Sequence, residues 1–147
     1  MILNFKPQFK GQILNGTKIH SIRYDRLSRW KPGMVIHFST GARTKLYNQF
    51  WYGHCKSIQN FTIERRRDKY DTVSTKIWID HRQLLIGEII EFADSEGFPD
   101  SVVSFYEFFI PLNHLKRQCY ENAQSYGLSE TSLTYHGRLI HWTNKRY

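Results

Sequence analysis

Two stretches of helical periodicity in the second half of the chain constrain the fold most. Apolar residues recur on one helical face from Leu85 to Phe92, which predicts a helix over residues 82–94. A second apolar stripe begins at Val102 and stops before Pro111, because proline cannot continue a helix. Earlier segments alternate in polarity with the shorter period of a strand. The chain is therefore expected to mix helices and strands, in the α+β class.

Short alternating segments predict the strands. They cover residues 18–23, 34–38, 54–63, 75–79 and 138–142. A short helix over residues 7–14 precedes them, with Gly16 at its C-terminal end, and Asp100 or Ser101 can cap the last helix. Together these elements predict a small β-barrel with two or three packed helices.

The remaining segments have weaker patterns. Residues 39–53 mix polar, basic and aromatic side chains, which predicts a long loop or an irregular hairpin. Residues 64–71 predict a charged turn, and residues 113–136 carry no clear pattern. A chain of 147 residues suits a single domain.

The charge balance gives the first functional indication. Lys and Arg number 21 against 13 Asp and Glu, and the chain holds 10 Phe, 9 Tyr and 4 Trp. This aromatic content argues against disorder, and cations beside aromatic faces suit the phosphates and bases of nucleic acids. No apolar run approaches the ~18 residues that span a membrane, and the first ten residues hold no signal-peptide core. We therefore expect a soluble, cytoplasmic protein with no membrane partner.

Two sequence motifs together resemble the signatures of a known family. Residues 15–23, Asn-Gly-Thr-Lys-Ile-His-Ser-Ile-Arg, resemble the Gly-x-Lys-x-x-Thr/Ser-x-Arg signature of the ASCH domain. Residues 93–98, Ala-Asp-Ser-Glu-Gly-Phe, with the aromatic helix that follows, resemble its second signature. The resemblance covers roughly residues 2–110 and is closest to phage-encoded members. It leaves residues 113–147 as a C-terminal extension with the closing strand.

The resemblance implies a PUA-like barrel with an RNA or nucleotide ligand in a cleft beside helices. Some small bacterial members are acetylcytidine amidohydrolases, in which a Lys and a Thr of the first signature and a Glu of the second carry the chemistry. The matching residues here are Lys18, Ser21 and Glu96, and Arg23 matches the arginine of the first signature. Serine replaces the family's threonine but keeps the hydroxyl.

These residue types suit amide cleavage. A serine hydroxyl attacks only after a base takes its proton, and a lysine can be that base when burial or a cation such as Arg23 lowers its pKa from about 10.4. Glu96 could pass a proton to the leaving amine. Lys18 and Ser21 would face opposite sides of a regular strand, so a shared site needs Lys18 in the turn after Gly16, or a bulge. Taken alone, these residues fit solvated strand ends and an ordinary strand hydroxyl better than a catalytic site.

The segment over residues 41–52 is a candidate nucleic-acid contact. Arg43 and Lys45 could meet phosphates, and Tyr47 or Trp51 could stack on a base. The alternative is that these aromatic side chains pack onto the barrel.

The charged turn is a second candidate contact. Arg65, Arg66 and Arg67, with Lys69, would form a phosphate-binding surface on a hairpin. A solvated hairpin tip is the alternative, because acidic residues dilute the charge.

No cofactor or metal is expected. The seven histidines and two cysteines form no set with recognised zinc spacing. Cys55 and Cys119 are expected to be reduced thiols rather than a disulfide.

The leading hypothesis is a domain that binds RNA or a modified nucleoside in a basic cleft. The alternative is an amide hydrolase that acts on an acylated pyrimidine nucleoside, with Ser21 as nucleophile and Lys18 as its base. A third hypothesis is a protein-interaction module with exposed aromatics such as Tyr106 and Phe109. It loses its basis if those side chains are buried between barrel and helices.

Overall fold

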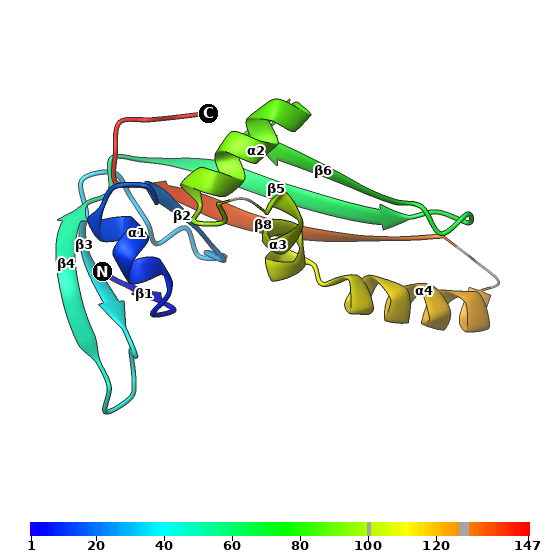
Figure 1. The fold of residues 1–147 in the computed structure, drawn as a ribbon, viewed down its shortest axis with the longest axis horizontal. Helices are drawn as coiled ribbons and strands as arrows, with labels where there is room; N and C mark the ends of the chain where they lie inside the picture. The colour runs from blue at the N-terminus through cyan, green and yellow to red at the C-terminus, as the bar shows by residue number, and fades with distance from the viewer. Residues whose placement is uncertain (100, 127–129) are drawn as a thin grey trace.

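The computed structural model describes residues 1–99, 101–126 and 130–147 (Figure 1). One sheet has the strand order β1-β3-β4 and comprises β1 (Ile2–Phe5), β3 (Val35–Thr40) and β4 (Asn48–His54). The other has the order β2-β8-β5-β6-β7 and comprises β2 (His20–Arg23), β8 (Thr131–His141), β5 (Ser57–Arg67), β6 (Val73–Ile79) and β7 (Arg82–Gln83). The helices are α1 (Phe9–Leu14), α2 (Ile86–Ser95), α3 (Val102–Phe109) and α4 (Leu112–Tyr126).

The smaller sheet packs against α1 to form one core. β1 pairs in parallel with β3, and β3 pairs antiparallel with β4, with a register shift after Phe38. Phe38 is fully buried and stacks on Phe5 of β1, and Phe9 and Ile13 of α1 complete the same apolar cluster. Burial of these rings fixes α1 beside the first strand of the chain.

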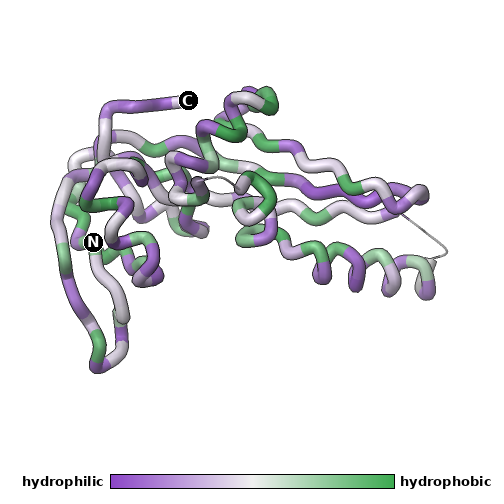
Figure 2. The backbone as a smooth tube through the Cα atoms, viewed as in Figure 1, coloured by the Kyte–Doolittle hydropathy of each residue, from purple (hydrophilic) through white to green (hydrophobic). Residues whose placement is uncertain are grey.

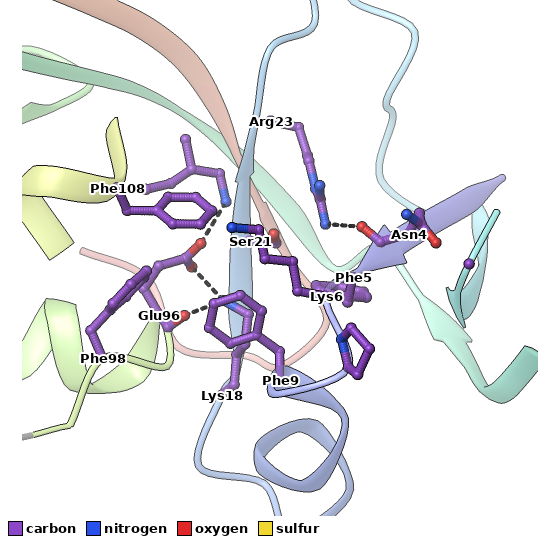
Figure 3. A pocket seen from close by; sticks show the side chains of 13 residues that line it. Asn4, Phe5, Lys6, Phe9, Lys18, Ser21, Arg23, Glu96, Phe98 and Phe108 are labelled. Carbon is purple, nitrogen blue, oxygen red and sulfur yellow. Dashed lines mark hydrogen bonds and ion pairs between the residues drawn. The ribbon is translucent and has the colours of Figure 1, made fainter. Parts of the chain in front are cut away.

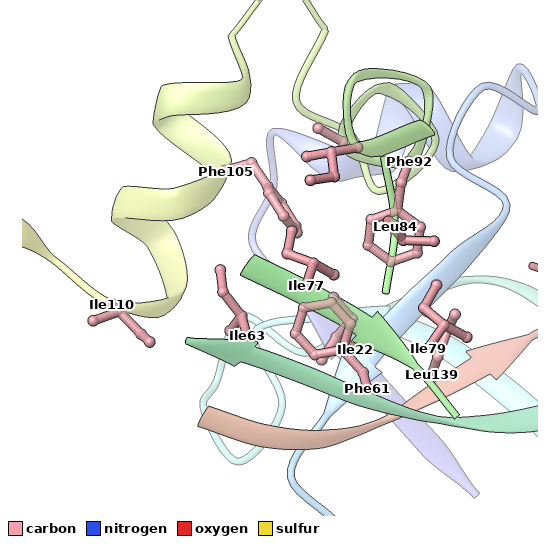
Figure 4. Packing of buried hydrophobic residues seen from close by; sticks show 12 residues of the cluster. Ile22, Phe61, Ile63, Ile77, Ile79, Leu84, Phe92, Phe105, Ile110 and Leu139 are labelled. Carbon is pink, nitrogen blue, oxygen red and sulfur yellow. The ribbon is translucent and has the colours of Figure 1, made fainter. Parts of the chain in front are cut away.

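The larger sheet extends away from the smaller one as a long arm of β5, β6 and β8 (Figure 1). Its inner end is covered by α2 and α3, where Phe92 and Phe105 pack on Phe61 of β5 (Figure 4). Along the arm, α4 lies with its hydrophilic residues away from the sheet (Figure 2). Its residues Leu115 and Cys119, four positions apart, are buried. Residues at this spacing share one helical face.

The mixed α+β class is confirmed, with four helices and eight strands in the described part. The short N-terminal helix is confirmed too. Gly16 follows it at a φ of +80°, the left-handed conformation that glycine adopts most easily. Ser101 caps α3 by accepting a hydrogen bond from the Ser104 backbone N–H at 3.0 Å, whereas the other predicted cap, Asp100, lies outside the described residues.

Several predicted boundaries are wrong. The first half of the predicted turn over residues 64–71 is strand, because β5 continues to Arg67. Residues 48–54 form β4, so the irregular hairpin rather than the long loop is correct. The predicted helix over residues 82–94 begins only at Ile86, after the two residues of β7.

The C-terminal third is also more regular than predicted. Residues 113–136 hold most of α4 and the beginning of β8, and β8 starts seven residues before the predicted strand over residues 138–142. The described strands pair within two sheets, and no pairing that closes them into a barrel is present among the described residues. No helix in the described ranges has the length and apolar character needed to cross a membrane.

Candidate functional site

A cavity of about 410 Å³ lies where the beginning of β2 meets the end of α2 and the segment around α1 (Figure 3). Four phenylalanines line it, from β1, from α1, from the residues after α2 and from α3: Phe5, Phe9, Phe98 and Phe108. Its polar lining includes the four residues that the two sequence motifs single out: Lys18, Ser21, Arg23 and Glu96. A volume of this size is typical of small-ligand pockets.

Lys18 stands in the irregular stretch between Gly16 and β2, one of the two placements that a shared site requires. Its backbone N–H donates to the Gln12 carbonyl of α1 at 2.9 Å, which fixes the turn. The side chain is only 2% exposed. Its Nζ donates to the backbone carbonyl of Glu96 and lies 3.1 Å from Oε2 of the same residue. Lys18 and Ser21 therefore both line the cavity although they lie three residues apart.

Glu96 is the residue that joins the two motifs. It caps the C-terminus of α2 and is buried. Its Oε1 accepts a hydrogen bond from the backbone N–H of Ile22 at 3.1 Å, and its Oε2 contacts both Lys18 and His20. The carboxylate thus holds β2 against the end of α2.

Burial and the neighbouring charges shift the pKa values of the side chains in this cluster. Burial lowers the pKa of Lys18 to about 8, although the Glu96 carboxylate acts in the opposite direction. Burial alone would raise the pKa of Glu96, but Lys18 and His20 outweigh it and hold that pKa below its ordinary range. At neutral pH the cavity therefore contains an ionised Glu96 and a Lys18 that loses its proton far more easily than an ordinary lysine.

His20 is a member of this cluster that the sequence motifs do not identify. Its Nδ1 lies 2.8 Å from Oε2 of Glu96, its Nε2 lies 3.1 Å from the Tyr147 hydroxyl, and its ring stacks on Phe92. Burial lowers the pKa of His20, which favours the neutral ring. Because an ionised carboxylate only accepts hydrogen bonds, the neutral ring donates from Nδ1 to Glu96. The only sequence signal is that His20 lies two residues after Lys18, on the same side of an alternating segment.

Ser21 and Arg23 follow on β2. Ser21 is buried, pairs with Ile140 of β8 and lines the cavity. The Arg23 guanidinium lies 4.8 Å from the centroid of the Phe5 ring, and its Nη2 donates to the Asn4 carbonyl at 2.7 Å. Its Nε is buried without a hydrogen-bond partner among the described residues.

The predicted contact segment over residues 41–52 lies beside the cavity rather than in it. Gly41 at its base lines the cavity, whereas Arg43 and Lys45 are exposed in the β3–β4 connection. Tyr47 and Trp51 are exposed, although the centroid of the Trp51 ring lies 4.6 Å from that of Phe38.

The three arginines of the predicted surface differ in burial: Arg65 is buried, Arg67 is partly buried and Arg66 is exposed. Arg65 is 6% exposed, and its Nη1 donates to Glu107 and to the Ile110 carbonyl, both at 2.6 Å. Arg66 faces solvent and pairs with Glu130, whereas the partly buried Arg67 pairs with Asp71. Lys69 lies over the ring of Tyr70, outside these ion pairs. The structure thus separates Arg65 from the surface of the arm.

Other candidate residues lie in structural positions. Tyr106 and Phe109 are partly buried and pack against the core of the larger sheet, which removes most of the basis for an exposed aromatic interaction surface. No disulfide joins Cys55 and Cys119, which both lie in the described part of the chain. Within that part, no three His, Cys, Asp or Glu side chains gather as a metal site would require.

The residues around the cavity thus come from segments that lie far apart in the chain: residues 18–23, Glu96 and the rings of Phe9, Phe98 and Phe108. A scan against protein-family models finds no match. Comparisons with the curated proteins and with the solved structures also find no significant match.

Proposed function

We propose that the protein binds a nucleoside, free or as a unit of an RNA, in the cavity beside Lys18 and Glu96. The observation that carries this proposal is the composition of the cavity wall, which combines the rings of Phe9, Phe98 and Phe108 with buried polar groups. Aromatic rings stack on bases, and precisely placed polar groups give a pocket its specificity. The cavity matches a flat, polar-edged ring better than it matches an aliphatic ligand.

We also propose that the chain is an ASCH domain with a PUA-like barrel. The protein would then be cytoplasmic. This assignment is supported by the meeting of both motifs at one cavity, since Lys18 and Glu96 lie 78 residues apart in the chain. The exposed cations Arg43 and Lys45 would then contact the phosphates of an RNA beyond the cavity.

Calorimetric titration with cytidine and acetylcytidine tests the binding proposal. Phe108→Ala should weaken binding by about fivefold or more, because a stacked base contributes about 1–3 kcal/mol. Tyr70→Ala removes an exposed ring far from the cavity and is the control. If neither nucleoside binds at millimolar concentration, the proposal is rejected.

Amide hydrolysis is a second candidate, favoured by the lowered pKa of Lys18 in the same cavity as Ser21. In this scheme Lys18 takes the Ser21 proton, and Oγ bonds to the carbonyl carbon of the acylated base. The C–N bond breaks, and the Lys18 ammonium returns the proton to the leaving amine. Water then hydrolyses the acyl-serine. Ionised Glu96 holds Lys18 in place and is a poor proton donor.

Cytidine release from acetylcytidine tests this second candidate. The rate should rise with pH up to about pH 8 and then level off, because the scheme needs Lys18 without its proton. Ser21→Ala and Lys18→Met should each abolish release. A cavity that binds acetylcytidine without releasing cytidine at high protein concentration would exclude hydrolysis and leave binding intact.

A further inference from the structure

The charges around the cavity do not balance. Lys18 is neutralised by Glu96 at 3.1 Å. Lys6 and Arg23 also line the cavity, and in the described part of the chain neither forms an ion pair with a carboxylate. The cavity therefore carries about two uncompensated positive charges at neutral pH, which favours an anionic ligand over a neutral one.

Arg23 is held ready to donate hydrogen bonds. Its guanidinium lies over the Phe5 ring, and Nη2 is fixed by the Asn4 carbonyl. Its Nε has no partner and no contact with solvent in the described structure. The guanidinium therefore keeps unused hydrogen-bond donor capacity beside the cavity that Arg23 lines.

Lys6 supplies a second, movable cation. It follows β1, is exposed, and its Nζ lies 4.9 Å from the centroid of Phe108, one of the rings in the cavity wall. In the view of Figure 3, Arg23 and Asn4 lie on the side of the cavity away from Glu96. The charged groups of the cavity thus divide into the Lys18–Glu96 pair and two cations, Lys6 and Arg23, without a carboxylate partner among the described residues.

From this division we infer that Lys6 and Arg23 form a phosphate subsite, so that the cavity takes a nucleoside bearing a phosphate in preference to the bare nucleoside. The base would lie against the phenylalanine rings, and the phosphate oxygens would accept hydrogen bonds from the guanidinium and the ammonium. This inference rests on the proposed function. The phosphate belongs either to a free mononucleotide or to the backbone of an RNA.

Calorimetry with cytidine, cytidine 5′-monophosphate and a cytidine trinucleotide tests the subsite. The monophosphate should bind about tenfold or more tightly than cytidine at low salt, and the advantage should shrink as salt is raised. Tighter binding of the trinucleotide than of the monophosphate identifies RNA as the source of the phosphate, and the reverse identifies a free nucleotide.

Variants connect the preference to the two cations. Lys6→Met, on an exposed side chain, and Arg23→Met should each reduce the preference for the monophosphate while cytidine affinity changes little. Lys76→Met on β6 removes the same charge from an exposed site outside the cavity and should leave the preference intact. Equal binding of cytidine and its monophosphate overturns the subsite but not the proposed function. A cavity that binds none of the three probes overturns both.

Discussion

The Nζ of Lys18 lies 3.1 Å from Oε2 of Glu96, and both side chains are almost completely buried. Opposite charges in such a position favour each other's ionised form, while burial disfavours both. The pair joins the start of β2 to the end of α2, across 78 residues of sequence. It therefore serves the fold as well as the proposed chemistry, and the two roles can be separated by experiment.

Glu96→Gln should destabilise the fold strongly. The variant leaves the Lys18 ammonium buried without its counter-charge, and breaking a buried pair in this way costs about 3–5 kcal/mol. Urea unfolding at pH 7 measures the loss. The control is Glu121→Gln, which breaks the exposed Arg117–Glu121 pair on α4 and should change stability by about 0.5 kcal/mol or less.

A double variant tests whether the loss comes from the pair itself. Adding Lys18→Met to Glu96→Gln removes the unpaired charge, so the double variant should be more stable than Glu96→Gln alone. Equal losses for Glu96→Gln and Glu121→Gln would show that the buried pair does not stabilise the fold.

Acid should remove the contribution of Glu96. Its pKa in the folded chain lies below the ordinary value of 4.5, so the unfolded chain binds more protons once the pH falls to about that value. The contribution is complete above pH 4.5 and is lost progressively as the pH falls through the folded pKa. The stability difference between the protein and Glu96→Gln should therefore be constant from pH 5 to 7 and shrink below pH 4.5. A difference that stays constant down to pH 3 would contradict this linkage.

Gly97→Ala should distort the cavity wall. Gly97 has a φ of +97°, and an added Cβ would lie 2.9 Å from Cδ1 of Phe9 and 2.5 Å from Oε1 of Gln12. The strained backbone alone costs about 1–2 kcal/mol, and displacement of the Phe9 ring should also weaken nucleoside binding. Gly87→Ala within α2 is the matched control, because its Cβ meets nothing within 4 Å. It should stabilise the helix by about 0.5–1 kcal/mol. Thermal unfolding and calorimetry measure both effects.

The local structure around the site was predictable, but its completion was not. The helix before Gly16 depends on residues that are neighbours in sequence, whereas the predicted strand over residues 18–23 begins only at His20 and leaves Lys18 in the turn. His20 was missed because its partners, Glu96 and Tyr147, come from distant segments. Periodicity carries no information about such contacts.

β1, α4 and the end of β5 were not predicted, for a similar reason. β1 is four residues long and is stabilised by parallel pairing with β3, more than 30 residues away. α4 is rich in polar side chains, and the contact of Leu115 with the sheet depends on the tertiary fold. The end of β5 was predicted too early because Arg65 is charged. A charged residue is stable at a buried strand position only with partners such as Glu107.

Variants of Arg65 and Arg66 on β5 should distinguish an arginine that stabilises the fold from one that is available to bind RNA. Arg65→Met should leave the Ile110 carbonyl and Oε1 of Glu107 without the donor that Arg65 supplies and cost about 1–3 kcal/mol in urea unfolding. Arg66→Met breaks an exposed pair and should cost less than about 1 kcal/mol. If the arm binds RNA, Arg66→Met should reduce the slope of log affinity against log salt by about one. Arg65→Met should leave that slope unchanged, because its guanidinium is buried. Unchanged slopes in both variants would place the RNA contacts away from these two arginines.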